Sequence, residues 1–295
     1  MSNYLAIDLG AESGRTILGT LSAGKLVLHE THRFANQPVR LPNALHWDIL
    51  RLWAEIKTGI AATVKDGVQL DSLGVDTWGV DFVLLDKDGN LLANPTHYRD
   101  ARTDGMLEEA FVLMPRSEIF ANTGIQFMQL NTLYQLLAML KADCSLFEIA
   151  KTFLTIPDLL NYWLSGKLTN EFTNATTTQC FNPQTKAWSS SLLDAMGIPE
   201  HLFNPISEPG TVLGGLQPSV AEETGAEGVQ VVVPACHDTG SAVVAVPAEN
   251  QDFAWLSSGT WSIMGAEVTE PVLGEKALEY NFTNEGGVFG TWRLS

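Results

Sequence analysis

The chain has 295 residues, 45% of them hydrophobic and 17% charged, which is enough to bury a sizeable core. Its net charge of −17, from 34 acidic and 17 basic residues, disfavours nucleic acid and anionic membranes as partners. It lacks a charge-free apolar stretch of about 20 residues and a basic region before its first apolar run, and its three cysteines are widely spaced, so we expect a cytoplasmic protein with no membrane partner.

The first third of the chain predicts three strands and a helix. Residues 4–9, 16–21 and 26–32 form short apolar runs separated by glycine-containing turns, which is typical of successive strands. Asp48 is a candidate helix N-cap. The apolar residues that follow it recur at helical spacing: Ile49, Trp53, Ile56, Ile60 and Val64.

The middle of the chain continues the alternation of strands and helices. Residues 72–90 contain two strand-like runs, with Asp88 and Gly89 as a turn signal. Helical patterns follow around residues 133–140 and over 157–164, where Pro157 suits a first helical turn. The run VQVVVPA (229–235) predicts a buried strand, and TGSAVVAV predicts the start of a helix. This order indicates an α/β layer fold.

Residues 253–265, FAWLSSGTWSIMG, repeat the design of the opening hairpin: an apolar strand, a small polar loop and a second apolar strand. Two such hairpins about 250 residues apart suggest two similar lobes that each present one loop. Only 30 residues follow Gly265, whereas an average domain needs on the order of 100 or more. We therefore expect a second lobe that is cut short.

The loop in YLAIDLGAESGRTILGTL is the first candidate site. Small residues let backbone N–H groups converge on phosphate oxygens, as Ala11, Ser13 and Gly14 would allow. Arg15 adds a charged donor, and Asp8 could hold Mg²⁺ through water. No Walker A or dinucleotide-binding pattern is present. The alternative is a solvent-facing hairpin without a ligand.

The second candidate is PACHDTGSAV, residues 234–243. An aspartate at the end of an apolar strand stands where open α/β sheets place catalytic groups. Asp238 could accept a proton from a substrate hydroxyl, and His237 could orient Asp238 or the substrate. The alternative is that Asp238 caps a helix and His237 packs in the core.

The third candidate combines DTWGVDF (76–82) with HYRDART (97–103). Gly79 would permit close approach of a ligand, and Trp78 could present an apolar face to a sugar ring. Asp81, Asp100 and Arg102 could form hydrogen bonds with sugar hydroxyls. The alternative places Trp78 in the core and Arg102 in a surface ion pair.

Taken together, these stretches resemble the FGGY carbohydrate kinases, in the family's order and over nearly the whole chain. DTWGVDFVLLD and TNATTTQ resemble the members that phosphorylate L-rhamnulose more than those that act on xylulose or glycerol. The chain departs from the family in its shorter length and in Glu12, which stands where a small polar residue is frequent. The stretches that carry the resemblance are DLGAESGR, DTWGVDFVLLD, YRDARTDG, TGIQF, LNTLYQL, PDLLNYWLSGKL, FTNATTTQ, HDTGSAV, LSSGTWS and TNEGG.

The resemblance implies an α/β fold: a ribonuclease H-like (actin-like ATPase) lobe with a mixed sheet and flanking helices, plus the start of a second similar lobe. It assigns residues 1–248 to an N-terminal sugar-binding lobe and 249–295 to the beginning of a nucleotide-binding lobe. The small-molecule partners would be a ketose and ATP, with Mg²⁺ as the metal. The implied reaction is phosphorylation of L-rhamnulose to L-rhamnulose 1-phosphate. L-fuculose or xylulose as the sugar, a non-catalytic sugar-binding lobe and, less favoured, an actin- or Hsp70-like ATPase remain alternatives.

The resemblance also assigns roles to single residues. Asp238 would be the catalytic base, and Asp8 would lie near Mg²⁺. ATP phosphates would meet a first loop and, at Thr260, a second loop. The first loop comprises Ala11, Ser13, Gly14 and Arg15. The sugar site would comprise Gly79, His237, Asp238 and Thr239, with Asp81 and Arg102 added.

Overall fold

The computed structural model describes residues 1–250, 252–258 and 262–295. Its main sheet has six strands in the order β13-β14-β6-β1-β2-β3. The pairs β1–β6 and β6–β14 are parallel, whereas β1–β2, β2–β3 and β13–β14 are antiparallel, so the predicted mixed sheet is confirmed. These strands are β1 (Ser2–Leu9), β2 (Ser13–Ser22), β3 (Lys25–Ala35), β6 (Ser72–Thr77), β13 (Val212–Gly215) and β14 (Gln230–Val232).

The strands of this sheet form where the sequence alternates apolar and polar residues. In β1 the side chains of Leu5, Ile7 and Leu9 are buried on one face, as a period of two requires. All three strands expected in the first third of the chain are present, each longer than expected by two to four residues in total.

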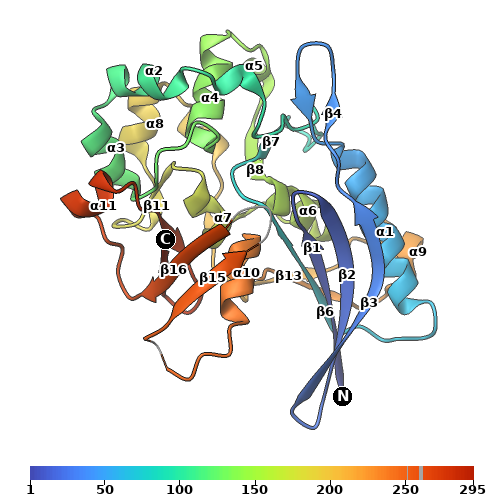
Figure 1. Cartoon of the computed structure of the whole chain (residues 1–295). Helices are drawn as coiled ribbons and strands as arrows, with labels where there is room; N and C mark the ends of the chain where they lie inside the picture. Colours follow the sequence, from blue (N-terminus) through green and yellow to red (C-terminus); the bar gives the residue numbers. More distant parts are fainter. Residues whose placement is uncertain (251, 259–261) are drawn as a thin grey trace.

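Four helices pack against this sheet or flank it: α1 (Ile49–Val64), α6 (Ile156–Ser165), α9 (Pro218–Thr224) and α10 (Asp238–Val244). Asp48 caps α1 as predicted, because its carboxylate accepts a hydrogen bond from the backbone N–H of Arg51 at 3.2 Å. Helices α1 and α9 lie side by side (Figure 1). Leu52, Ile56 and Ile60 of α1 belong to the main hydrophobic core, together with Leu5, Ile7 and Leu9 of β1.

A second group of helices lies beyond the main sheet, at the top of Figure 1, around a separate core that includes Leu133, Leu137 and Phe153. The helices of this group are α2 (Met106–Leu113), α3 (Arg116–Thr123), α4 (Thr132–Lys141), α5 (Leu146–Ile149) and α8 (Ser190–Met196). Helix α7 (Phe172–Thr177) belongs to a smaller cluster, in which Phe172 packs with Phe181 and Trp292. The short strands form two-stranded pairs: β4 (Val39–Arg40) with β5 (Leu45–His46), β7 (Phe82–Leu85) with β8 (Thr152–Thr155), β9 (Asn170–Glu171) with β12 (Ile206–Ser207), and β10 (Phe181–Asn182) with β11 (Ala187–Trp188). Two 3₁₀ turns span Ala101–Thr103 and Glu200–Leu202.

The last part of the chain forms a four-stranded sheet in the order β15-β16-β18-β17. Its strands are β15 (Ala254–Ser258), β16 (Ser262–Val268), β17 (Asn284–Gly286) and β18 (Trp292–Leu294), and α11 (Glu275–Glu279) precedes β17. The antiparallel pairing of β15 with β16 confirms the second hairpin that the sequence predicts. Within the described residues, no helix is long and apolar enough to cross a membrane.

Candidate functional site

A cavity of about 650 Å³ lies at the carboxyl ends of the parallel strands β1, β6 and β14. Asp8 and Asp76 face each other in the register of β1 and β6, and a bridge between Thr77 and His237 places the start of α10 next to them. Ligands of open α/β sheets bind at this edge. The volume is within the range of small-molecule sites.

The loop between β1 and β2 forms one wall of the cavity. The N–H of Gly10 donates to the carbonyl of Ser13 at 2.9 Å, which closes a tight turn. Asn36 braces this turn: its N–H donates to the Glu12 carbonyl and its Nδ2 to the Gly10 carbonyl, both at 2.9 Å. The loop is therefore held in one shape, and Gly10 and Ala11 line the cavity.

Asp8 and Arg15 form an ion pair across the opening hairpin. They are register partners in β1 and β2, and the Nη2 and Nε atoms of Arg15 lie 2.7 and 2.8 Å from Oδ2 of Asp8. Both side chains are partly exposed and line the cavity. The guanidinium reduces the negative charge at the end of β1.

Three carboxylates gather at this end of the cavity: Asp8, Asp76 and Asp238. The pKa of Asp76 is raised well above its usual range, first by burial and then by the charges of Asp8 and Asp238. A cation between them would relieve this repulsion. Within the described residues, no group of three or more His, Cys, Asp or Glu side chains stands close enough to hold a metal alone. Mg²⁺ takes one or two carboxylates and completes its shell with water and phosphate oxygens, and Asp8 and Asp76 supply ligands of this type.

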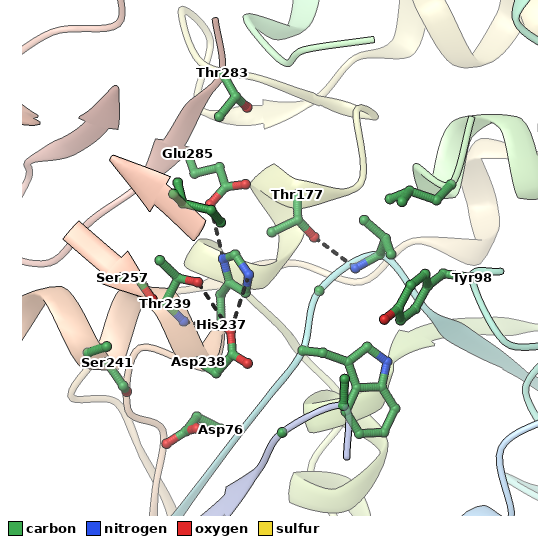
Figure 2. A pocket seen from close by; sticks show the side chains of 18 of the residues that line it. Asp76, Tyr98, Thr177, His237, Asp238, Thr239, Ser241, Ser257, Thr283 and Glu285 are labelled. Atoms are coloured by element: carbon green, nitrogen blue, oxygen red, sulfur yellow. Dashed lines mark hydrogen bonds and ion pairs between the residues drawn. The ribbon is translucent and has the colours of Figure 1, made fainter. Parts of the chain in front are cut away.

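Asp238 is the first residue of α10, and His237 takes the N-cap position. Oδ1 of Asp238 accepts hydrogen bonds from the N–H and hydroxyl of Thr239, at 2.6 and 3.3 Å. Within the described residues Oδ2 has no protein donor, and the side chain lines the cavity (Figure 2). Burial raises the pKa of Asp238, while His237 and Thr239 oppose this rise. A carboxylate with a raised pKa and one free oxygen suits a general base.

His237 lies between two carboxylates. Its Nε2 is 3.5 Å from Oδ1 of Asp238, and its Nδ1 is 3.0 Å from Oε2 of Glu285. Figure 2 shows the three side chains along one side of the pocket, with Tyr98 on the opposite side. The backbone N–H of His237 donates to the hydroxyl of Thr173 at 3.0 Å, which ties it to α7.

The turn after β6 forms the opposite wall. A Cβ on Gly79 would lie 2.9 Å from Oγ1 of Thr177, so only glycine lets this turn pack so closely on α7. The next residue, Val80, has φ of +68°, which is strained for a β-branched side chain. Three hydrogen bonds hold it there: its N–H donates to Thr177, and its carbonyl accepts from Thr132 and Gln135.

Asp81 and Arg102 lie behind this wall and do not line the cavity. Asp81 is 1% exposed, and its Oδ2 accepts hydrogen bonds from the indole N–H groups of Trp47 at 2.5 Å and Trp78 at 3.0 Å. Burial raises the pKa of Asp81 to about 6, although these hydrogen bonds oppose the rise. Arg102 donates to the Oε1 atom of Gln135 at 2.6 Å, and Gln135 in turn donates to Asp81. Both residues therefore fix the position of Trp78.

Apart from Asp81 and Arg102, the predicted site residues fall into three groups. Asp8, Ala11, Arg15, Gly79, His237, Asp238 and Thr239 line one cavity, although they come from distant parts of the chain. Ser13 and Gly14 start β2, outside the cavity lining, and a Cβ on Gly14 would lie 2.3 Å from the ring of Phe34, so packing explains that glycine. Thr260 lies outside the described residues.

Several residues that line the cavity or support it were not among the predicted site residues. The cavity lining also includes Asp76, Tyr98, Ile125, Met128, Leu130, Thr177 and Glu285, and Arg293 supports it from behind. Asp76 opens the motif DTWGVDF and Glu285 lies in TNEGG, so both were in motifs already noted. Ile125 lies in TGIQF and Leu130 in LNTLYQL, whereas Met128 lies outside the noted motifs.

The family model that describes the N-terminal domain of the FGGY family of carbohydrate kinases matches residues 3–245. A rhamnulokinase from Oceanobacillus iheyensis is 50% identical over 290 residues, covering 98% of this chain and 61% of the relative. A rhamnulokinase from Bacteroides thetaiotaomicron is 46% identical over 292 residues, covering 99% of this chain and 60% of the relative. The chain thus spans about 60% of the length of these curated relatives.

Solved structures show the same fold. A ligand-bound xylulose kinase from Lactobacillus acidophilus matches with a TM-score of 0.89 at 18% identity, over 100% of this chain and 59% of that one. A Plasmodium falciparum glycerol kinase with ADP matches with a TM-score of 0.85 at 15% identity, over 100% and 60%. The expected actin-like ATPase fold with mixed sheet and helices is therefore confirmed. Since the family model covers most of the chain, this protein belongs to the FGGY family of carbohydrate kinases.

Proposed function

We propose that this chain takes part in ATP-dependent phosphorylation of a ketose, and that the sugar is L-rhamnulose, with L-rhamnulose 1-phosphate as product. Family membership and the relatives named rhamnulokinase support this proposal. The observation that carries it is the position of Asp238, whose free carboxylate oxygen faces the same cavity as the β1–β2 loop. A base for a hydroxyl and a turn suited to phosphate thus meet in one space.

Asp238 would act as the general base. Its Oδ2 takes the proton from the C1 hydroxyl of the ketose as the oxygen attacks the γ-phosphorus of ATP, and the bond from phosphorus to the β-phosphate oxygen breaks to release ADP. Thr239 holds Oδ1, so that only Oδ2 turns toward the substrate. His237, Thr239 and Gly79 would contact the sugar, whereas Asp81 and Arg102 would act indirectly, by holding Trp78.

The β1–β2 hairpin would hold the phosphates. We assign contacts with ATP to Ala11, Ser13, Gly14 and Arg15, and to Thr260 in the second hairpin. Asp8 would hold Mg²⁺, with Asp76 beside it. When bound, the metal supplies positive charge that neutralises the phosphoryl oxygens. Arg15 can reach a phosphate only if it gives up its bonds to Asp8. Asp8 would then bind the metal, and Arg15 would bind the phosphate.

We further propose that residues 1–248 form the sugar-binding lobe and that 249–295 begin the nucleotide-binding lobe. The three cysteines are free thiols, which suits the reducing cytoplasm as the location. Because the chain spans about 60% of its curated relatives, a lobe that binds sugar without catalysis is a second candidate.

The test is calorimetric titration with L-rhamnulose, L-fuculose and D-xylulose, then with ATP and Mg²⁺, followed by an assay of phosphate transfer. We expect L-rhamnulose to bind more tightly than the other two ketoses. Transfer that is present in the wild type and lost in Asp238→Asn supports the kinase. Binding of sugar without ATP binding or transfer supports the second candidate. The exposed carboxylate variant Asp66→Asn is the matched control, and absence of ketose binding would overturn the proposal.

A further inference from the structure

An ion pair between strands β17 and β18 borders the cavity on the side of His237 and Asp238. Glu285 on β17 and Arg293 on β18 are direct register partners in an antiparallel pair. Cross-strand partners of opposite charge contact each other on one face of a sheet. Arg293 is 1% exposed, and its side chain is among the largest that the fold buries completely. A charge buried so deeply needs a close partner, because its desolvation is costly.

The pair is joined to His237. Nη2 of Arg293 lies 3.1 Å from Oε2 of Glu285 and 3.1 Å from Nδ1 of His237, and that Nδ1 is 3.0 Å from the same Oε2. Nε of Arg293 donates to the carbonyl of Gly286 at 2.9 Å. Within the described residues, both ion-pair contacts of the Glu285 side chain use the same carboxylate oxygen, Oε2.

The second oxygen of Glu285 is left for a ligand. In the part of the chain that the structure describes, Oε1 has no protein donor, although the side chain is only 17% exposed and lines the cavity. Figure 2 places Glu285 on the same side of the pocket as His237 and Asp238. Burial alone would raise the pKa of Glu285, but the charges of His237 and Arg293 lower it to about 2, so the carboxylate stays ionised.

The backbone around Glu285 is fixed on both sides. The N–H and Nδ2 of Asn284 both donate to the carbonyl of Gly124 at 2.9 Å. On the other side, the N–H of Gly286 donates to Oγ1 of Thr176 at 2.9 Å. Glu285 thus stands on a strand bound to the ends of α3 and α7, and such support gives a binding group a defined position.

We propose that Glu285 binds a hydroxyl group of the sugar through Oε1, and that Arg293 and His237 are positioning residues that hold its carboxylate through Oε2. The inference rests on the proposed function, since it needs a polyhydroxylated substrate in this cavity. The inference also implies that the segment after residue 248, which we assign to the nucleotide-binding lobe, completes the sugar site.

The experiment measures dissociation constants by calorimetry for L-rhamnulose and for its analogues that each lack one hydroxyl. The variants are Glu285→Gln and the double variant Glu285→Gln with Arg293→Met, which leaves no unpaired buried charge. Glu279→Gln, an exposed carboxylate in the same segment, is the control. Circular dichroism and thermal unfolding show whether each variant is folded.

We expect both Glu285 variants to bind L-rhamnulose at least about tenfold more weakly, since each loses a hydrogen bond to a charged acceptor, and the control to bind as the wild type does. One deoxy analogue should bind the wild type and Glu285→Gln equally weakly. The hydroxyl that this analogue lacks is then the one that Glu285 binds. Wild-type affinity in the folded double variant would show that the pair is only structural and would overturn the inference while the proposed function stands. No ketose binding by the wild type would overturn both.

Discussion

Glu171 offers a test of how the buried polar helix α7 supports the site. The side chain is completely buried and accepts hydrogen bonds from the N–H of Thr173 at 2.8 Å, the hydroxyl of Thr173 at 2.7 Å and the N–H of Asn174 at 2.9 Å. The hydroxyl of Thr173 in turn accepts from the backbone N–H of His237. Glu171 therefore connects the start of α7 with the segment that carries Asp238.

Burial raises the pKa of Glu171 from its ordinary value of 4.5 to about 8, although its hydrogen bonds with Thr173 and Asn174 oppose the rise. Between these two values the folded protein binds more protons than the unfolded chain, so the free energy of unfolding falls as pH rises. From pH 6 to pH 8 this one group accounts for a loss of about 2 kcal/mol.

The perturbation is Glu171→Gln, which keeps the shape of the side chain and removes its titration. The assay is urea unfolding at several pH values between 6 and 8, for the wild type and the variant. All other titrating groups are shared, so the difference between the two profiles isolates Glu171. We expect the wild type to lose about 2 kcal/mol more than the variant over this interval. Parallel profiles would contradict this prediction, because they would mean that Glu171 is ionised in the folded protein.

The remaining predictions use the same unfolding assay. Gly14→Ala should destabilise the protein by about 1–3 kcal/mol, because the new Cβ would overlap the ring of Phe34. The control is Gly67→Ala: Gly67 has φ of +79° and no atom within 4 Å of a new Cβ, so this change should lower the free energy of unfolding by only about 1 kcal/mol. Equal losses in the two variants would contradict the packing argument. Asp81→Asn should cost about 1–3 kcal/mol and change the tryptophan fluorescence, because an amide cannot accept from all three buried donors; unchanged stability would contradict this. Val80→Gly should stay within about 1 kcal/mol of the wild type, since relief of strain offsets the lost side chain, and a larger loss would show that Val80 is not strained.

Local patterns in the sequence predicted the main elements well. The apolar period of α1 and its cap at Asp48 are properties of neighbouring residues, and both are present. The hairpins β1–β2 and β15–β16 follow from apolar alternation on both sides of a small polar loop. The helices packed around β7 and β8 were predicted only in part, because α2, α3 and α8 are short and depend on burial against one another.

The candidate site was predictable where a motif ends a strand, as at Asp8 and Asp238. It was not predictable where residues meet only through pairing of distant segments. Glu285 and Arg293 become partners through the register of β17 and β18, and they reach His237 only in the folded chain. The burial of Asp81 behind Trp78 likewise depends on Trp47, 34 positions away in the sequence.

We propose above that the cavity beside Asp238 binds a ketose. The most direct test is a crystal structure of this chain grown with saturating L-rhamnulose. We predict electron density for the sugar in the cavity, with its C1 hydroxyl within about 3.2 Å of Oδ2 of Asp238. A saturated crystal in which the cavity holds only solvent, or in which the sugar binds with its C1 hydroxyl turned away from Asp238, would contradict the claim.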